Sequence, residues 1–520
     1  MKKRLVIILC IAALLLTPAI TFAAGGQGEA STEETPTITV MVNSGAAAHH
    51  RPASNDLAAY QAREEFSGIH VEWDVIETAN YNEIVGARLA SGVSLPDVMR
   101  IGGNLFEKAR EEELIIPLDD LIESNGPNLK KWFAKEENGI FNASWRSPDG
   151  NLYGINNKVL PNNLSLNIMF AVPWLERLGL EQPTTTDEAL DVWRKFRDED
   201  ANGNGNPNDE VPYVTSVGGL QFLGNSFGLR GSTSGAPYNF EGGKVTWNYT
   251  DDRYKALLKF LNTMWEEGLI DKEFANVNSV IQLERTANDI AGSVYFWSTW
   301  AYKFSSAHPD GDPKGEKPLF TIAPPLEGPF GDKYFEKRII PGGGGLTISS
   351  ASKVPETAME WIDFVYASEK GFEVYAWGVE DITFKYDGGN KVKIEAPDGV
   401  AWNEAMLRIG AGQPPWSHEQ SILAWKAIMP AWQFPFDDLN RKYYIEPFPP
   451  LAKTQAEIET VNEFSTDINT YFGEMRMKFI LGQADIDATW DEYVRTLKRM
   501  GSDELLRVHQ QIYDRYMAMQ

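Results

Sequence analysis

The pattern of apolar and polar positions along residues 37–101 changes back and forth between that of a strand and that of a helix. Residues 37–42, 69–76 and 96–101 alternate or are rich in β-branched residues, which predicts strands. The segments 55–65 and 81–90 between them are predicted helices, and Gly92 ends the second. Strands that alternate with helices predict an α/β fold in which a parallel sheet carries helices on its faces.

Ligands of such sheets bind beyond the carboxyl ends of the strands. These ends fall at residues 43–45 and 100–104, so the polar candidates for ligand contact are Asn43, Ser44 and Arg100. The glycines nearby form neither G-x-G-x-x-G nor G-x-x-x-x-G-K, so a phosphate loop is not predicted there.

A second block of helices follows residue 155. Pro173 fits the first turn of a short helix that Gly179 ends, and Thr185 with Glu188 forms a capping box for the next helix. Thr250 is the predicted cap of a longer helix that ends at Gly268. One face of that helix is apolar and is predicted core: Tyr254, Leu257, Leu258, Leu261 and Trp265.

Aromatic residues gather where the predicted strand 291–297 ends. Trp297, Trp300 and Tyr302 lie at this strand end and in its exit loop, where rings are well placed to stack on a ligand. Further candidates are Trp377, Trp402, Trp416 and Trp432. The alternative for each ring is a place in the core.

Four glycines in the segment 341–345 precede a predicted strand at 346–350. They suit a backbone crossing or a hinge better than a packed interior. A helix is predicted at 355–366, and the last hundred residues are helical by pattern up to residue 516.

Length and charge narrow the class of protein. At 520 residues the chain is too long for one core and indicates two or three domains. A formal net charge of -25 argues against nucleic acid and anionic membrane as partners. The 16 Trp, 19 Tyr and 26 Phe exceed what a core alone requires.

The N-terminus predicts export. A basic start is followed by the apolar run 5–16 and a small-residue exit, so residues 1–23 are a predicted signal peptide and 24–36 a flexible leader. The alternative is a membrane anchor, but the run is shorter than the roughly 20 residues that span a bilayer. Cys10, the only cysteine, lies inside this run, so the mature chain would have no disulfide, cysteine–zinc site or cysteine nucleophile. We expect a soluble protein in the periplasm or outside the cell.

The segment 198–210, DEDANGNGNPNDE, has the spacing of a calcium loop. Oxygen-bearing side chains recur at every second position, as a hard cation with six to eight oxygen ligands requires, and Gly205 stands at the turn position. The predicted ligands are Asp200, Asn202, Asn204, Asn206, Asn208, Asp209 and Glu210. A second register begins at Asp198 and ends at Asp209. The alternative is an Asn/Gly turn that binds no ion.

Three ordered stretches resemble the extracellular solute-binding proteins of ABC sugar importers. They are Trp174-Leu-Glu-Arg-Leu-Gly-Leu180 with the loop up to Pro212, then Gly342-Gly-Gly-Gly-Leu-Thr-Ile348, and last the region from Lys478-Phe-Ile-Leu-Gly482 to Tyr516. The chain is most similar to the long branch that carries a structural calcium loop, which includes lipoproteins and alginate-oligosaccharide-binding proteins. It departs from the family at Ala171 and Pro173, where an Arg-x-Asp is frequent, and at Pro207, which lengthens the loop.

The resemblance implies a two-lobe fold of the type II periplasmic-binding-protein class. Each lobe would be a mainly parallel sheet flanked by helices, with a hinge between them. The implied N-terminal lobe is 37–157 plus 341–400, and the C-terminal lobe is 158–340 plus 401–520. A sugar or oligosaccharide would be held between the lobes by aromatic stacking and passed unchanged to a membrane permease by a monomeric protein.

Two other classes of protein are open. A secreted glycosidase would need two carboxyl groups about 5–10 Å apart, and the sequence contains enough acidic residues for that but no H-E-x-x-H or G-x-S-x-G motif. A surface adhesin would have no use for a hinge between two lobes.

Overall fold

The computed structural model describes residues 35–44, 52–135, 139–156, 166–231, 237–336, 344–412, 429–448 and 453–518. The segments Met1–Thr35 and Pro36–Gln520 are two separate units, and the description below concerns the second. The predicted signal peptide lies outside the described residues.

The first sheet has four strands in the order β10-β3-β1-β2. β1 is parallel to β2 and β3, while β10 is antiparallel to β3. Their bounds, with the connecting helices, are β1 Thr37–Asn43, α1 Ala58–Ser67, β2 His70–Ile76, α2 Tyr81–Ser91, β3 Val98–Gly102 and β10 Gly344–Ile348. The strand–helix alternation predicted for this region is therefore confirmed.

Helix α1 begins three residues later than predicted. Asn55 is tied to β2 instead: its Nδ2 donates to the Val71 carbonyl at 2.9 Å, and its Oδ1 accepts from Trp73 Nε1 at 2.9 Å. These bonds hold residues 55–57 in a turn against the sheet.

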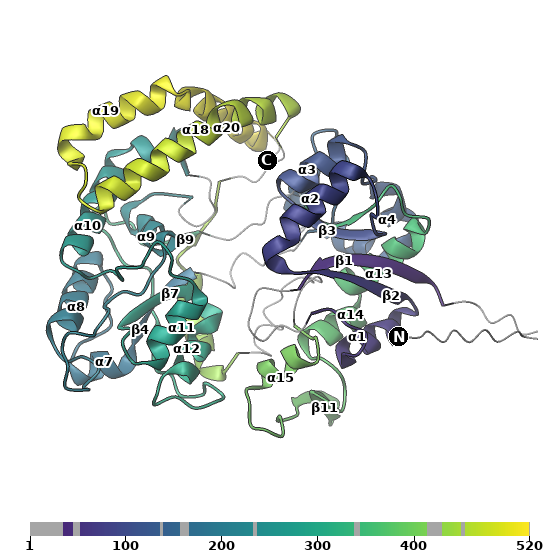
Figure 1. Ribbon diagram of the computed structural model, residues 1–520, viewed down its shortest axis with the longest axis horizontal. Coiled ribbons are helices and arrows are strands. Elements are labelled where there is room, and N and C mark those ends of the chain that lie inside the picture. Colours follow the sequence, from purple (N-terminus) through teal and green to yellow (C-terminus); the bar gives the residue numbers. More distant parts are fainter. Residues whose placement is uncertain are drawn as a thin grey trace, which may run out of the picture. The chain divides into compact units, whose positions relative to one another are not determined.

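Both faces of the first sheet are buried. Ile38, Val40 and Val42 of β1 join one core cluster, whereas Met41 faces the other cluster. Figure 1 shows the helices that flank this sheet. One cluster is completed by α4 (Asp119–Asn125), α5 (Pro127–Phe133) and α13 (Pro355–Ala367), and the other by α2 and α3 (Asn104–Glu111). A third, small cluster joins α1 to α14 (Glu369–Ala376) and α15 (Trp402–Arg408) through Ala59, Val374 and Met406.

The second sheet has the order β7-β4-β8, with β4 (Leu166–Ala171) antiparallel to β7 (Ser293–Trp297) and β8 (Phe320–Ile322). The expectation of a mainly parallel sheet is wrong for these named strands, and parallel pairing here is found in isolated bridges such as Val214↔Val294. The reason lies in the connections. β7 and β8 are joined by α12 (Ala301–Ala307) and run in the same direction, whereas β4, which comes more than a hundred residues earlier in the chain, lies between them in the opposite direction.

A single large core surrounds the second sheet. Its helices include α7 (Val172–Arg177), α8 (Thr186–Asp198), α10 (Asp252–Glu266), α11 (Ser279–Ala287), α18 (Gln455–Ile480), α19 (Ile486–Arg499) and α20 (Ser502–Met517). The last three lie side by side in Figure 1.

Helix caps confirm one prediction and correct another. The capping box of α8 is present, since Thr185 accepts from the Glu188 amide and Glu188 accepts from the Thr185 amide. The cap of α10 is Asp251, which accepts from the Arg253 amide, and not Thr250. Thr250 donates its hydroxyl to the Trp247 carbonyl and belongs to a 3-10 turn before the helix.

Two glycines of β10 lie where backbones cross. Gly345 has a φ of +112°, and a Cβ built there would lie 2.2 Å from the Ile155 carbonyl oxygen. A Cβ on Gly344 would lie 2.8 Å from the Gly102 Cα. Only glycine allows this approach of three chain segments, which agrees with the predicted backbone crossing.

The remaining elements are short. They are η1 Thr78–Asn80, α6 Gly139–Trp145, α9 Val217–Phe222, η3 Leu223–Phe227, β5 Tyr238–Glu241, β6 Lys244–Trp247, η4 Asn248–Thr250, η5 Ser298–Trp300, β9 Phe335–Glu336, α14 Glu369–Ala376, β11 Phe384–Asp387, β12 Asn390–Lys393, α15 Trp402–Arg408, η6 Ala431–Gln433, α17 Phe434–Arg441 and β13 Tyr444–Ile445. Over the part of the chain that the structure describes, every helix is too short or too polar to cross a membrane.

Candidate functional site

A cavity of about 750 Å³ lies among α11, α12 and the start of α15. We call it the α12 cavity. Its wall combines apolar and polar side chains: Ser279, Val280, Leu283, Glu284, Ala287, Phe296, Trp300, Tyr302, Lys303, Ser306, Ala307, Pro313, Val400, Ala401, Asn403, Glu404 and Arg408. This volume falls within the range of roughly 300–1,000 Å³ that small-molecule sites occupy.

The aromatic wall of the α12 cavity comes from the end of β7 and the helix that follows. Phe296 and Trp300 pack with ring centroids 4.5 Å apart, and Trp300 keeps part of its surface open. Tyr302 is nearly buried, and its hydroxyl accepts a hydrogen bond from Asn403 Nδ2. This bond joins α12 to α15, so the cavity depends on residues a hundred positions apart.

Trp297 is half-buried but does not line the α12 cavity. It pairs with Leu166 across β4, and its side chain points to the face of the sheet opposite that of Phe296, because successive residues of a strand alternate. The structure therefore separates Trp297 from Trp300 and Tyr302, although all three were predicted together.

Lys303 places an ammonium in the α12 cavity. Its Nζ lies 4.0 Å from the centre of the Trp300 ring, a cation–π arrangement. Burial lowers the pKa of Lys303, and the negative charge of Glu404 opposes that shift. Glu404 lies 3.8 Å from Arg408, which also pairs with Asp398.

Trp377 and Trp402 form a different cluster. Their ring centroids are 5.9 Å apart, and Trp402 Nε1 donates to the Thr383 carbonyl at 2.6 Å. Lys391 lies over Trp377 and Lys393 over Trp402, both from strand β12. These two indoles therefore fasten the β11–β12 hairpin to α15.

Trp432 connects η6 to the chain on either side of α12. Its Nε1 donates to the Gly315 carbonyl at 2.9 Å, and the neighbouring Gln433 donates from Nε2 to the Ser298 carbonyl at 2.9 Å. Both bonds connect η6 to the segments that flank α12. Trp416 lies outside the described residues.

The predicted strand-end residues lie on the first sheet. Asn43 ends β1, and the Ser44 hydroxyl donates to Glu77 Oε2 at 3.1 Å. Arg100 lies within β3, where its carbonyl accepts from the Tyr81 hydroxyl at 2.7 Å. Burial lowers the pKa of Arg100, and Tyr81 opposes that shift.

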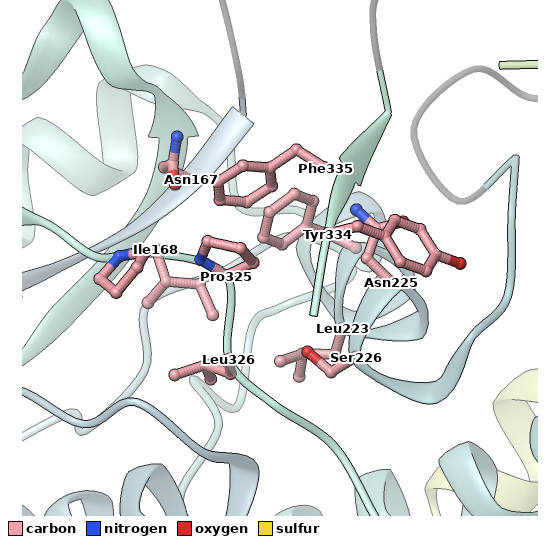
Figure 2. A pocket seen from close by; sticks show the side chains of 11 residues that line it. Asn167, Ile168, Leu223, Asn225, Ser226, Pro325, Leu326, Tyr334 and Phe335 are labelled. Atoms are coloured by element: carbon pink, nitrogen blue, oxygen red, sulfur yellow. The ribbon is translucent and has the colours of Figure 1, made fainter. Parts of the chain in front are cut away.

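A second cavity, shown in Figure 2, is too small for a sugar. Its volume of about 10 Å³ corresponds to one water molecule. Asn225, with 2% exposure, lines it, and neither amide atom of this side chain has a hydrogen-bond partner among the described residues. An ordered water is the ligand that this space and this amide fit.

The loop 200–210 gathers the predicted oxygen ligands by direct contacts. Asn202 Nδ2 and Asn204 Nδ2 donate to the two oxygens of Asp209 at 3.2 and 2.9 Å. Asp200 Oδ2 accepts from the Gly205 amide at 3.0 Å, and Glu210 Oε1 accepts from the Ala201 amide at 3.1 Å. The side chains of Asn206 and Asn208 are exposed.

Two carboxylate oxygens of this loop fit a cation. Asp200 Oδ1 and Glu210 Oε2 are buried and have no hydrogen-bond partner among the described residues. Burial raises the pKa of Glu210, and the charge of Asp209 raises it further. Within those same residues, no three His, Cys, Asp or Glu side chains form a metal-binding group by themselves, so a cation here would also need the asparagine oxygens.

Sequence patterns could not have found Lys303, Asn403, Glu404 and Arg408 as wall residues of the α12 cavity. None belongs to a motif, and the lysine and the glutamate are separated by 101 positions. Only the packing of α12 against α15 brings them together.

Two sheets with separate cores and a cavity lined by aromatic and charged side chains are the features of a protein that holds a small solute. The chain belongs to the bacterial extracellular solute-binding protein family, whose model matches residues 48–371. Its relatives include FusA of Streptococcus pneumoniae, a fructooligosaccharide ABC transporter substrate-binding protein, which is 28% identical over 500 residues, 89% of this chain and 88% of FusA. The lipoprotein LipO of Bacillus subtilis is 22% identical over 88% of this chain and 89% of LipO.

Solved structures show the same fold. FusA of S. pneumoniae in complex with kestose superimposes with a TM-score of 0.76 and 24% identity, covering 93% of this chain and 100% of FusA. The alginate-binding protein AlgQ2, solved without calcium ion, gives a TM-score of 0.74 and 23% identity over 93% of this chain and 99% of AlgQ2. The two-lobe solute-binding fold is therefore confirmed. By its family the chain is a solute-binding protein and not an enzyme.

Proposed function

We propose that this chain is the substrate-binding component of an ABC importer and that its ligand is an oligosaccharide, which it releases unchanged. The observation that carries the proposal is the α12 cavity, with its aromatic wall and its few polar groups. The names of the relatives support it: FusA is bound to kestose, and YtcQ of B. subtilis is a polygalacturonan/rhamnogalacturonan-binding protein, 25% identical over 51% of each chain.

The chemistry of the cavity suits a sugar. Pyranose and furanose rings are apolar on their C–H faces and polar at their rims. Trp300 and Phe296 offer apolar surface, while Lys303, Asn403 and Glu404 offer donors and acceptors for hydroxyl groups. Trp297, Asn43, Ser44 and Arg100 do not line the α12 cavity, and any contact they make would be with further units of a longer oligosaccharide.

Ligand binding would act through the two lobes, whose predicted bounds are 37–157 plus 341–400 and 158–340 plus 401–520. A ligand that contacts both lobes favours the closed arrangement by its differential affinity for that state. The closed form would be the one that the permease recognises, and a monomer is sufficient for this cycle.

The loop 200–210 would hold a structural calcium. Asp200, Asn202, Asn204, Asp209 and Glu210 would supply the inner oxygens, with Asn206 and Asn208 at the rim. The two buried oxygens without a partner support this assignment. The ion would stabilise the fold by binding the native state and would take no part in contact with the sugar.

Export would follow the signal peptide at residues 1–23, with cleavage leaving the mature protein in the periplasm or outside the cell. The family itself is extracellular, which supports this location.

A binding experiment tests the proposed function. Tryptophan fluorescence and isothermal titration with neutral and charged oligosaccharides should show binding, while chromatography of the same mixtures should show no product. Trp300→Ala should weaken binding about tenfold or more, since it removes an aromatic wall of the cavity. Trp265→Ala is the control, because Trp265 packs on Phe274 outside the cavity. Hydrolysis of the bound sugar would overturn the proposal in favour of the glycosidase.

A further inference from the structure

Lys303 lacks the carboxylate partner that a half-buried lysine normally has. Among the described residues no carboxylate oxygen lies within 4.0 Å of its Nζ and no hydrogen bond to it is found; its closest recorded neighbour is the Trp300 ring. Burial removes part of the hydration of its ammonium group, which lowers the pKa of Lys303. Lys303 lines the α12 cavity, so the N–H donors that do not point at the Trp300 ring are available to a ligand there.

The lining of the α12 cavity has equal numbers of positive and negative side chains, but the two cations differ in whether they already have a carboxylate partner. The lining residues include two cations, Lys303 and Arg408, and two carboxylates, Glu284 and Glu404. Arg408 is already engaged by Asp398 and lies close to Glu404. Lys303 is thus the cation left for a ligand, and it shares the cavity with two carboxylates.

This balance disfavours any ligand with a net charge. A ligand carboxylate could pair with Lys303 but would be repelled by Glu284 and Glu404, and the net charge of -25 would oppose its approach. A ligand ammonium would be attracted by Glu284 and Glu404 but repelled by Lys303 and Arg408, so it gains no net attraction from the lining and still loses its hydration. Hydroxyl groups meet neither penalty, because each can accept from Lys303 and donate to Glu404.

We infer that the α12 cavity selects neutral oligosaccharides, and that Lys303 and Glu404 are the pair that sets this selectivity. Lys303 donates to ligand hydroxyls and excludes amino sugars, whereas Glu404 accepts from ligand hydroxyls and excludes uronates. The inference rests on the proposed function, which it narrows to one class of sugar.

The test compares ligands of three charges on one protein. Isothermal titration at low and moderate salt uses a neutral fructooligosaccharide, an oligogalacturonate and a chitosan oligosaccharide. The neutral sugar should bind at least about tenfold more tightly than either charged one. Lys303→Met should weaken binding of the neutral sugar by about tenfold to a hundredfold and improve binding of the chitosan oligosaccharide. Glu404→Gln should weaken the neutral sugar likewise and improve the oligogalacturonate.

Control variants remove the same charges elsewhere. Lys385→Met on β11 and Glu72→Gln on β2 alter exposed side chains outside the cavity and should leave all three affinities unchanged. Melting temperatures identify a variant that fails to fold, and the comparison of ligands on the unaltered protein needs no variant.

The outcomes distinguish failure of the selectivity inference from failure of the proposed function. Binding of a charged sugar as tight as that of the neutral one overturns the inference and leaves the proposed function in place. Selectivity that survives both cavity variants also overturns it. Binding of none of a wide panel of saccharides overturns the proposed function together with the inference.

Discussion

The surroundings of two carboxylates, Glu210 and Glu373, shift their pKa values in opposite directions. Glu210 is buried beside Asp209, which raises its pKa, whereas Glu373 is held ionised by its neighbours although burial opposes this. The first group is costly to ionise and suits a cation, while the second stabilises the fold as it stands.

Replacing Glu210 tests the calcium loop. Glu210→Gln removes one negative charge but keeps an oxygen for the Ala201 amide. In chelator the variant should melt at or above the temperature of the unaltered protein, since a carboxyl with a raised pKa costs stability once the pH exceeds that pKa. In calcium the order should reverse, because an ion at a hundred times its Kd contributes about 2.7 kcal/mol. Melting curves in chelator and in calcium measure both effects; an equal response of the two proteins to calcium would contradict the assignment.

Glu373 predicts a loss of stability in acid. Burial alone would raise its pKa, but hydrogen bonds from Lys370, Lys391 and Tyr386 hold it at about 2. Since the folded pKa lies below the usual 4.5, the contribution is present above about pH 4.5 and is lost as the pH falls toward 2. Urea unfolding of Glu373→Gln should show a stability deficit at pH 6 that shrinks toward pH 2.5. A deficit that does not change with pH would show that packing, not charge, explains the loss.

At the scale of elements, β10 closes the first sheet by a close approach of backbones. Gly345→Ala places a methyl group 2.2 Å from the Ile155 carbonyl oxygen and forces a φ of +112° on alanine. The conformation alone costs about 1–3 kcal/mol, and the overlap adds to it. Chemical denaturation should therefore show a strong loss of stability.

A glycine with open space around it provides the matched control. Gly473 lies inside α18, and nothing lies within 4 Å of a Cβ built there. Gly473→Ala should raise stability by roughly 0.5–1 kcal/mol, since alanine favours helix. If both substitutions had the same effect, the crossing at Gly345 would not explain the glycine run.

Sequence periodicity was sufficient to predict the helices and strands that pack against segments close to them in the chain. The alternation in residues 37–101 predicted β1, β2 and β3, and the capping box of α8 was readable from two residues. Direction in the second sheet was not readable, because β4 meets β7 across more than a hundred residues. For the same reason aromatic content indicated candidate rings but could not tell that Trp402 fastens a hairpin while Trp300 lines a cavity.

At the scale of the whole molecule, both cores are built from distant segments. The first combines residues 38–155 with 346–366, and the second combines 168–335 with 448–513. α20 contributes Leu505, Val508 and Ile512 to the second core, and its Arg515 pairs with Glu457 at 2.8 Å.

Removal of α20 should therefore abolish the second core. A chain that ends at residue 500 should lose cooperative thermal unfolding and become sensitive to protease at low concentration. Leu505→Ala, which removes one buried side chain, should only lower the midpoint, by the roughly 2–5 kcal/mol typical of such a deletion. A shortened chain that still unfolds in one sharp transition would show that α20 is dispensable.

The interleaving of segments sets an order of events during synthesis. β3 can pair with β10 only after β10 has been synthesised, more than two hundred residues later. The second core can be completed only when α20, the last helix, has been synthesised. The cluster of Met41 with α2 and α3 can form once residue 115 has been made, but the other core of the first sheet needs residues up to 366 and the second core needs residues up to 513. A chain whose larger cores form this late can stay incompletely folded for much of its synthesis, which suits a protein of an extracellular family that crosses a membrane before it folds.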